Sequence, residues 1–405
     1  MRLPGYVSPK KIRQLLGFVL LTAWVPNLQA AESPAIRLAL VAGSAMPEVV
    51  YDPRHDGCGE NDIPDAGARA FRDSNGEIHL IAAHFENRQS VGQDFYQLQH
   101  HCALVFQSHQ SGDPSAYDDR SWLTAFYTDD GKTVHALIHH EYVGSAHSSD
   151  LCKSGNYTRC WENSVLSTRS SDGGVHYAQP RIPSDLIATT PFTYIGEAAG
   201  KNIGYFQPSN IMRRGEFYLS LIYAEGFGHQ QYGVCLFGTR NLTEARSWRA
   251  WDGERFSVSF PDPYRERVSQ PTPACQPVGL DAGLGYPIMS LVEDQVTGNF
   301  VATLLIVGQG TEAAERGVYY TVSRDLIQWS KLSRLWAVEV PWVHVCGTEP
   351  AVAYPALIDQ RSPDRNFGTI SPTPALFLYY TEFEYGGCGA AVNRRLMRRP
   401  VLVQR

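Results

Sequence analysis

A hairpin pattern that recurs five times along the chain constrains the fold more than any other feature of the sequence. Each copy has a short strand, a tight turn with Gly, Asn or Asp, and a second strand rich in β-branched and aromatic residues. The copies are Ala68 to Phe71 with Ile78 to Ala82, Trp122 to Tyr127 with Val134 to His139, Asn210 to Met212 with Phe217 to Tyr223, Pro287 to Leu291 with Phe300 to Val307, and Tyr354 to Ile358 with Leu376 to Thr381. About 75 residues are available to each copy, which is enough for a four-stranded sheet with long loops, and such sheets arranged radially form a β-propeller.

The sequence therefore predicts an all-β fold, a five-bladed β-propeller with four-stranded antiparallel blades around a central channel. A β-sandwich is the alternative, but it does not predict five recurrent hairpins. The 35 Gly, 25 Pro, 21 Tyr and 17 Phe residues favour short strands and tight turns over long helices. Three copies are followed by a Ser/Thr-x-Asp/Asn element with a downstream aromatic residue, and we expect Asp172 and Asp325 in these elements to cap turns rather than to react.

The first 30 residues have the organisation of a secretory signal peptide. A basic start is followed by the apolar stretch Leu15 to Trp24 and by small residues up to Ala30, after which we expect cleavage. The apolar stretch is short for a membrane span, no later segment reaches its length, and no Cys stands at the cleavage site. The prediction is a soluble mature chain, 31–405, that forms a single propeller domain and is secreted or periplasmic.

The cysteines and the charge narrow the compartment and the partners. All eight Cys lie beyond the signal peptide, and an even count in an exported chain predicts up to four disulfides. Cys152 and Cys160 are close enough to close one loop, whereas the other pairings stay open. Zinc is the rival explanation, but no Cys-x-x-Cys spacing supports it. The chain carries a net charge of −6, and the mature part is more acidic because the leader is basic, so nucleic acid is excluded as a partner.

Several segments resemble the blades of five-bladed glycoside hydrolases of the arabinanase/xylosidase and invertase/levansucrase groups. They are Asp65 before Ala68 to Phe71, Pro208 to Ile211, Val318 to Trp329, and Tyr354 to Asp359. The elements around Asp172 and Asp325 are similar to the Asp boxes of sialidases. The Trp-Met-Asn-Asp-Pro motif of invertases and the Asp-Pro pair of arabinanases are absent, so reaction and substrate stay open. The resemblance implies a carbohydrate ligand.

The resemblance also implies a carboxyl pair at the mouth of the channel. By position, Asp65 would be the base or nucleophile, with Asp62 as its rival, and Glu141 would be the acid. Glu349 is the alternative acid or a group that modulates the acid's pKa. Polar residues at the starts of first strands and the ends of second strands are expected to bind substrate: Asp62, Arg69, His84, Arg88, His140, Asn210 and Tyr286. We expect Asp65, Arg69 and Glu141 to converge on the ligand.

Structural interpretations stand beside these functional ones. Asp62 and Asp65 flank Pro64 and could cap a turn, and Glu141 could be a solvated charge at a strand end. No metal ligand set is evident, and a Ca²⁺ ion in the channel, as in some relatives, has no residue pattern here to support it. His140-Glu141 with His147 lacks the spacing of zinc proteases, and no Gly-x-Ser-x-Gly elbow is present. The alternative function is a propeller that binds glycan or a surface partner without catalysis, and the oligomeric state is left open.

Overall fold

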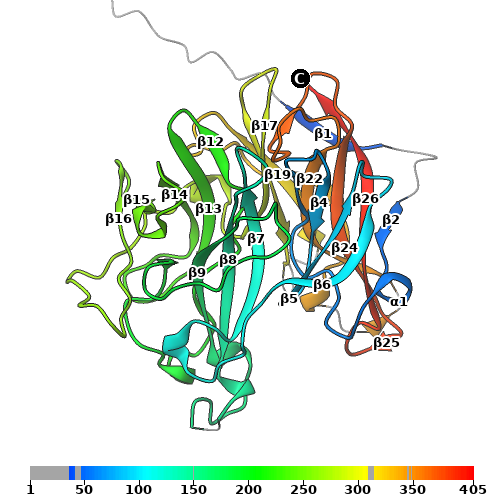
Figure 1. Cartoon of the computed structure of the whole chain (residues 1–405). Coiled ribbons are helices and arrows are strands. Elements are labelled where there is room, and N and C mark those ends of the chain that lie inside the picture. Colours follow the sequence, from blue (N-terminus) through cyan, green and yellow to red (C-terminus); the bar gives the residue numbers. More distant parts are fainter. Residues whose placement is uncertain (1–35, 42–46, 149, 309–313, 344–345, 348) are drawn as a thin grey trace, which may run out of the picture. The chain divides into compact units, whose positions relative to one another are not determined.

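The structure is a computed structural model that describes residues 36–41, 47–148, 150–308, 314–343, 346–347 and 349–405. The expected signal peptide, residues 1–30, lies outside the described residues. Over the described ranges, β-strands dominate, and the one α-helix is the single turn α1 (Pro53–Asp56), whose N-terminus the Asp52 side chain caps (Figure 1). No helix among these residues has the length and apolar character needed to cross a membrane. The prediction of a nearly all-β chain is confirmed.

Apart from one two-stranded pair, the described strands fall into five mainly antiparallel groups, and each group contains one of the five predicted hairpins. The second and third groups are continuous with each other in one ten-stranded sheet. The first group is β3 (Arg69–Arg72), β4 (Ile78–Ile81), β5 (Glu86–Gly92) and β6 (Gln99–Gln107), and the second is β7 (Arg120–Tyr127), β8 (Val134–Val143), β9 (Trp161–Ser170) and β10 (Leu186–Ala188). The third is β11 (Ile203–Phe206), β12 (Met212–Arg214), β13 (Phe217–Glu225), β14 (Gly233–Thr239), β15 (Arg249–Trp251) and β16 (Phe256–Val258). The predicted hairpins are β3–β4, β7–β8, β12–β13, β17–β18 and β22–β24, all with antiparallel registers.

The last two groups bring distant parts of the chain together. The fourth is β17 (Ile288–Asp294), β18 (Phe300–Ile306), β19 (Gly317–Ser323), β20 (Ser333–Ala337) and the short β23 (Thr369–Ile370). The fifth is β22 (Ala351–Asp359), β24 (Leu376–Glu384) and β26 (Asn393–Gln404), completed by β1 (Arg37–Leu40) and β2 (Glu48–Tyr51) from the other end of the described chain. Figure 1 shows the blue N-terminal strands against the red β26. A two-stranded pair, β21 (Cys346–Gly347) with β25 (Gly387–Cys388), lies outside the five groups.

Each group packs its apolar side chains against the next group in the sequence. Five clusters of buried side chains lie between groups one and two, two and three, three and four, four and five, and five and one. Phe71, for example, is fully buried between the first and second groups. Because every sheet is covered on both faces, both sets of alternating side chains are apolar, which explains the continuous apolar runs in the sequence.

Hydrogen bonds also join neighbouring groups in order. The Asn87 side chain accepts from the Leu123 N–H and donates to the Ser121 carbonyl, each at 2.8 Å. β9 and β11 pair in parallel, and Gly204 permits this close approach because a Cβ there would lie 2.0 Å from the Asn163 oxygen. The Leu291 N–H donates to Asn210 Oδ1 and joins the third and fourth groups, and the Leu357 N–H donates to Ser290 Oγ and joins the fourth and fifth. The Arg72 N–H donates to the Arg365 carbonyl and joins the fifth group to the first.

The Asp elements downstream of the hairpins have the expected structural role. Asp172 Oδ1 accepts from Ser170 Oγ at 2.6 Å and from the His176 N–H at 3.0 Å. Asp325 Oδ1 accepts from the backbone N–H groups of Ile327 and Gln328. Both carboxylates therefore satisfy the backbone donors of a tight turn.

Candidate active site at the ends of β8 and β22

Asp65 lies on the segment that leads into β3 and is contacted from three directions. Its N–H donates to the carbonyl of Ala82, just past the end of β4, which fixes the backbone. Its Oδ1 accepts from the Tyr354 hydroxyl at 3.1 Å and from Arg394 Nη1 at 2.5 Å, and its Oδ2 lies 3.6 Å from His84 Nε2. The carboxylate is thus ion-paired with a guanidinium and hydrogen-bonded to a phenol, and its side chain is 15% exposed.

Glu141 lies near the end of β8 and is almost fully buried, with 7% of its surface exposed. Its Oε2 accepts from the Tyr157 hydroxyl at 2.9 Å, and its Oε1 lies 3.6 Å from His139 Nε2. Burial raises the pKa of the Glu141 carboxyl to about 8, the negative charge of Asp65 adds to this, and the Tyr157 hydrogen bond and Arg120 act in the opposite direction. At neutral pH the Glu141 carboxyl is therefore mainly protonated. It is not the solvent-exposed charge at a strand end that was the structural alternative.

Aromatic side chains connect the two carboxyl groups. The His84 ring meets Trp122 edge-on with 5.5 Å between ring centroids, and Trp122 stacks on His139 at 5.7 Å. The chain of contacts from Asp65 to Glu141 is thus continuous. The Arg120 charge acts on both Glu141 and His84, and burial lowers the pKa of His84 and lowers that of His139 to about 4. The two carboxyl groups are therefore linked by neutral imidazoles and one indole, and together they form the candidate site.

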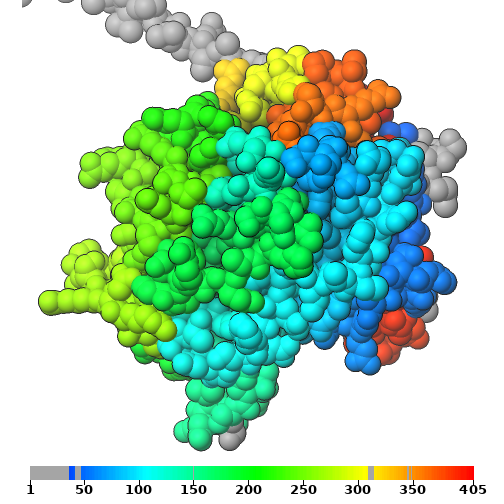
Figure 2. Space-filling view, viewed as in Figure 1, coloured from blue at the N-terminus to red at the C-terminus, as the bar shows by residue number. Residues whose placement is uncertain are grey.

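The loop closed by Cys152 and Cys160 brings Tyr157 to this site. The predicted Cys152–Cys160 disulfide is present, and the loop leads into the 3₁₀ turn Thr158–Cys160 and then β9. The Tyr194 hydroxyl lies between the two ends of the loop, 3.0 Å from the Cys160 carbonyl and 3.2 Å from the Leu151 carbonyl, and its one proton can be donated to either. The Tyr157 ring packs 5.2 Å from Trp161 and is 40% exposed, so one edge faces solvent while the hydroxyl reaches Glu141. In Figure 2 the turquoise-green segment that contains this loop stands out at the lower edge of the view.

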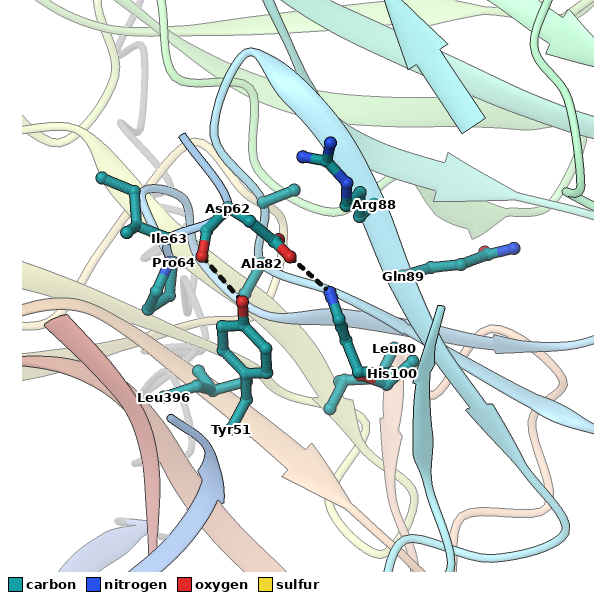
Figure 3. Close-up of a pocket in the computed structure, with 12 residues that line it drawn as sticks. Tyr51, Asp62, Ile63, Pro64, Leu80, Ala82, Arg88, Gln89, His100 and Leu396 are labelled. Atoms are coloured by element: carbon teal, nitrogen blue, oxygen red, sulfur yellow. Dashed lines mark hydrogen bonds and ion pairs between the residues drawn. The ribbon is translucent and has the colours of Figure 1, made fainter. Parts of the chain in front are cut away.

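Arg69 and Asp62 do not join Asp65 and Glu141. The Arg69 guanidinium is buried, its Nη1 donates to the adjacent Ala68 carbonyl, and burial alone lowers its pKa to about 9. No acidic group among the described residues pairs with it. Asp62 points into a separate pocket beside β5 and β6, where its carboxylate contacts His100 (Figure 3). Among the described residues, Asp65 and Glu141 are thus linked through His84, Trp122 and His139, whereas no such link reaches Arg69.

The other expected substrate-binding residues divide between three surroundings. Arg88 lines the same pocket as Asp62 and donates to the Cys102 carbonyl and to Glu86. His140 lies on the opposite face of β8 from Glu141, where Nε2 accepts from the Asp119 N–H and Nδ1 meets Ser164 Oγ. Asn210 ties the third group to the fourth, Tyr286 is half-buried against the core between those groups, and Glu349 is exposed before β22. His84 is the one expected substrate-binding residue for which a contact with Asp65 is seen among the described residues.

The described residues contain one group of side chains spaced closely enough for a metal ion, namely Cys58, Asp62 and His100. Cys58 is disulfide-bonded to Cys102, so its sulfur is not a free ligand. The group therefore offers two ligands rather than three. The other disulfides are Cys235–Cys275 and Cys346–Cys388, which brings the number to the four that the even count allowed.

Sequence reasoning missed two residues of the site, Arg394 and Tyr157. Arg394 comes from β26, which the hairpin pattern does not include, and a basic run at 394–399 looks like a solvated edge. Tyr157 had a signal, because it lies inside the one loop whose disulfide could be predicted and four residues before β9, the strand that pairs with β8. An aromatic residue in a disulfide-closed loop next to a candidate acid is a pattern worth weighing in other sequences.

Comparisons with known proteins find similar solved structures, several of which are glycoside hydrolases. No known family pattern and no curated protein sequence matches it. Similar solved structures include a protein of unknown function from Dyadobacter fermentans (12% identity, 92% of this chain and 100% of that chain covered, TM-score 0.46). They also include the catalytic domain of a family 62 α-L-arabinofuranosidase from Coprinopsis cinerea (10%, 91% and 98%, 0.45) and an endo-arabinase from Bacteroides thetaiotaomicron (9%, 85% and 97%, 0.47). The expected resemblance to arabinanase-type enzymes is thus confirmed as a likeness of structure, and it decides neither reaction nor substrate.

Proposed function

We propose that the chain is an exported glycoside hydrolase whose five antiparallel groups are the five blades of one β-propeller. In this proposal it cleaves an oligo- or polysaccharide between Asp65 and Glu141. The fold is supported by two kinds of contact that run in the same cyclic order, namely the apolar clusters between consecutive groups and the hydrogen bonds that join them, including those from the fifth group to the first. The four disulfides support export, because such bonds persist in oxidising compartments.

The observation that carries the proposed chemistry is the difference between the two carboxyl groups of one site. Hydrolysis of a glycosidic bond needs one protonated carboxyl to donate to the leaving oxygen and one ionised carboxyl to activate water or attack carbon. Glu141, with a pKa of about 8, can donate at neutral pH. Asp65, ion-paired with Arg394, is the acceptor or nucleophile. Glu349 is exposed and has no ion pair among the described residues, so we assign the acid to Glu141.

The walls of the site fit a sugar. Trp122 is buried and Trp161 is half-buried, and the buried indole Nε1 atom of each has no hydrogen-bond partner within the described part of the chain. Trp342 is 54% exposed and meets Tyr354, which itself donates to Asp65. Exposed aromatic faces beside a carboxyl pair are suited to stacking on pyranose or furanose rings.

The test is turnover of a panel of oligosaccharides, with reducing ends measured after incubation. We expect at least one glycan to be cleaved, and we expect Asp65→Asn and Glu141→Gln each to lower kcat by roughly 10²–10⁴-fold. Glu60→Gln, a change of the same type at an exposed position, is the matched control and should keep full activity. Glycan binding without cleavage by the wild-type chain would instead establish a propeller that binds glycan, and loss of activity in Glu60→Gln would show that the assay reports folding.

A further inference from the structure

The pocket beside β5 and β6 contains a serine, a histidine and an aspartate in a line. Ser90 and His100 are directly opposite each other across the β5–β6 pair. Ser90 Oγ lies 3.2 Å from His100 Nδ1. On the other side of the ring, His100 Nε2 lies 2.9 Å from Asp62 Oδ2 (Figure 3). These distances lie in the range for a nucleophile, its base and the group that orients the base.

We propose that Ser90, His100 and Asp62 form a second hydrolytic site, which cleaves esters of small carboxylic acids such as acetyl esters. This site is separate from the Asp65–Glu141 site, and the proposal does not depend on the glycosidase proposal. Ser90 would be the nucleophile, His100 the general base, and Asp62 the group that holds the imidazole in the required tautomer.

The surroundings of Asp62 fix that tautomer. The Cys58 N–H donates to the same carboxylate oxygen at 2.9 Å, and the Tyr51 hydroxyl holds the Asp62 backbone by donating to its carbonyl at 2.7 Å. Burial acts to raise the pKa of Asp62, but the hydrogen bonds from His100 and Cys58 and the charge of Arg88 hold it below its ordinary value. An ionised Asp62 keeps the imidazole proton on Nε2, which leaves the lone pair of Nδ1 facing Ser90.

The disulfide and a bulge in β5 hold the three residues in place. Cys58, whose N–H binds Asp62, is bonded to Cys102, two residues beyond His100 on β6. The loop that carries Asp62 is therefore tied to the strand that carries His100. The register of β5 against β6 shifts between Asn87 and Gln89, and Arg88 at this bulge lines the pocket. The nucleophile is held by strand pairing, which is why the absence of a Gly-x-Ser-x-Gly elbow does not exclude it.

The size of the pocket selects the acyl group. Its cavity of about 30 Å³ has room for roughly two water molecules, which matches an acetyl group and not a long acyl chain. Apolar side chains line one side of it: Ile63, Pro64, Leu80, Ala82, Ala83 and Leu396. Arg88 supplies the positive charge on the other side, where the carbonyl oxygen of a bound ester would become negative.

The reaction would proceed in two balanced steps. Ser90 Oγ attacks the carbonyl carbon of the ester while its proton moves to His100 Nδ1, and Arg88 stabilises the resulting oxyanion. The ester C–O bond then breaks, the alcohol leaves with the proton from His100, and the acyl group stays on Ser90. In the second step water adds to the acyl-serine with His100 again as base, releasing acetate and restoring the Ser90 hydroxyl.

The experiment uses the full mature chain and two readouts. A fluorophosphonate probe is incubated with the protein and the labelled serine is identified by mass spectrometry, and hydrolysis of p-nitrophenyl acetate is compared with that of the octanoate. We expect labelling at Ser90, a preference for acetate, and a loss of about 10²-fold or more in acetate turnover in Ser90→Ala and in Asp62→Asn. Ser74→Ala, at an exposed turn, is the matched control.

The labelling result does not depend on how the variants fold. If the wild-type chain is not labelled at Ser90, or if folded Ser90→Ala keeps its acetate turnover, the proposal is overturned. Equal turnover of acetate and octanoate would also overturn the assignment of the pocket to the acyl group. A positive result with no glycan cleavage in the panel would separate this activity from the glycosidase proposal.

Discussion

Asp62 and Asp65 are three residues apart, yet they belong to different sites. Asp65 turns toward Tyr354 and Arg394 in the candidate site that includes Glu141, whereas Asp62 turns toward His100 in the pocket beside β5 and β6. Pro64 between them prevents a regular strand from continuing, so the two side chains are free to leave the segment in different directions. Nearness in sequence therefore does not assign two acids to one site, and their partners decide the chemistry.

The buried acids of the two regions also differ in the direction of their pKa shift. Glu141 receives one hydrogen bond, from Tyr157, and has the negative charge of Asp65 nearby, so burial dominates and its pKa rises to about 8. Its neighbour His139 is neutral and supplies no compensating charge. Asp62 receives donors from His100 and from the Cys58 backbone, and Arg88 adds a positive charge, so its pKa falls. The donor count around a buried carboxyl, and not burial alone, sets its protonation state.

The largest expected effect is on kcat/KM, and it distinguishes the role of Glu141 from that of Asp65. The two variants should respond differently when the substrate has a better leaving group. An acid is needed only when the leaving oxygen is a poor leaving group, so Glu141→Gln should lose roughly 10²–10⁴-fold in kcat/KM on a natural glycan. On the matching p-nitrophenyl glycoside it should lose far less, because that phenolate leaves without a proton. Asp65→Asn should lose activity on both. Initial rates on the two substrate types measure this, and equal losses of Glu141→Gln on both would remove the acid role.

The second prediction concerns the free energy of unfolding. Replacing Glu141 by Gln and replacing Asp62 by Asn should change it in opposite directions. The pKa of Glu141 is raised in the folded state, so Glu141→Gln should stabilise the fold by about 1–3 kcal/mol at pH 7, and this gain should vanish as the pH falls below about 4.5. The pKa of Asp62 is lowered, so Asp62→Asn should destabilise the fold by about 1–3 kcal/mol at pH 7. That loss should shrink as the pH falls below about 4, where the wild-type carboxyl becomes protonated as well.

Urea denaturation of the three proteins between pH 3.5 and 8 measures both differences. Glu60→Gln serves as the control, since an exposed side chain should change stability little at any of these pH values. If both substitutions changed the free energy of unfolding in the same direction at pH 7, the contrast between the two regions would be wrong.

The smallest expected effect concerns the pH dependence of hydrolysis. The rate should fall as the pH rises through about 8, because Glu141 loses its proton there. The Tyr157 hydroxyl stabilises the ionised carboxylate, so Tyr157→Phe should move this decline to higher pH by about 0.5 unit. Profiles of kcat/KM against pH test the shift, with Tyr96→Phe at a 68% exposed position as the control. A decline that moved to lower pH would contradict the hydrogen bond to Glu141.

The sequence was sufficient to locate the hairpins and to suggest part of the candidate site. Turn residues and apolar strands are local signals, so all five hairpins could be located, and Cys152–Cys160 followed from spacing alone. Asp65 and Glu141 could be placed together because strand starts and strand ends follow from a hairpin. His84 lies beside Asp65 for the same reason.

What could not be predicted depends on partners far away in the sequence. The direction of the Arg69 side chain, and the departure of Asp62 toward His100, are decided by packing between strands that the hairpin pattern does not relate. Arg394 reaches Asp65 from 329 residues away. His140 and Glu141 are adjacent, and the alternation of a strand sends them to opposite faces, so only one of them belongs to the site.

The place of β26 in its sheet has a consequence for the order in which the chain folds. β26 pairs with β24 on one side and with β1 and β2 on the other, so the strand partners of residues 37–40 and 48–51 lie among residues 396–404. The first four groups are built largely from strands that follow one another closely and can form early, whereas the fifth must wait for both ends of the described chain. Loop closure over such a separation is slow. A polypeptide of this design therefore stays incomplete until residues 393–404 have been made, because they are the shared partner of β24, β1 and β2.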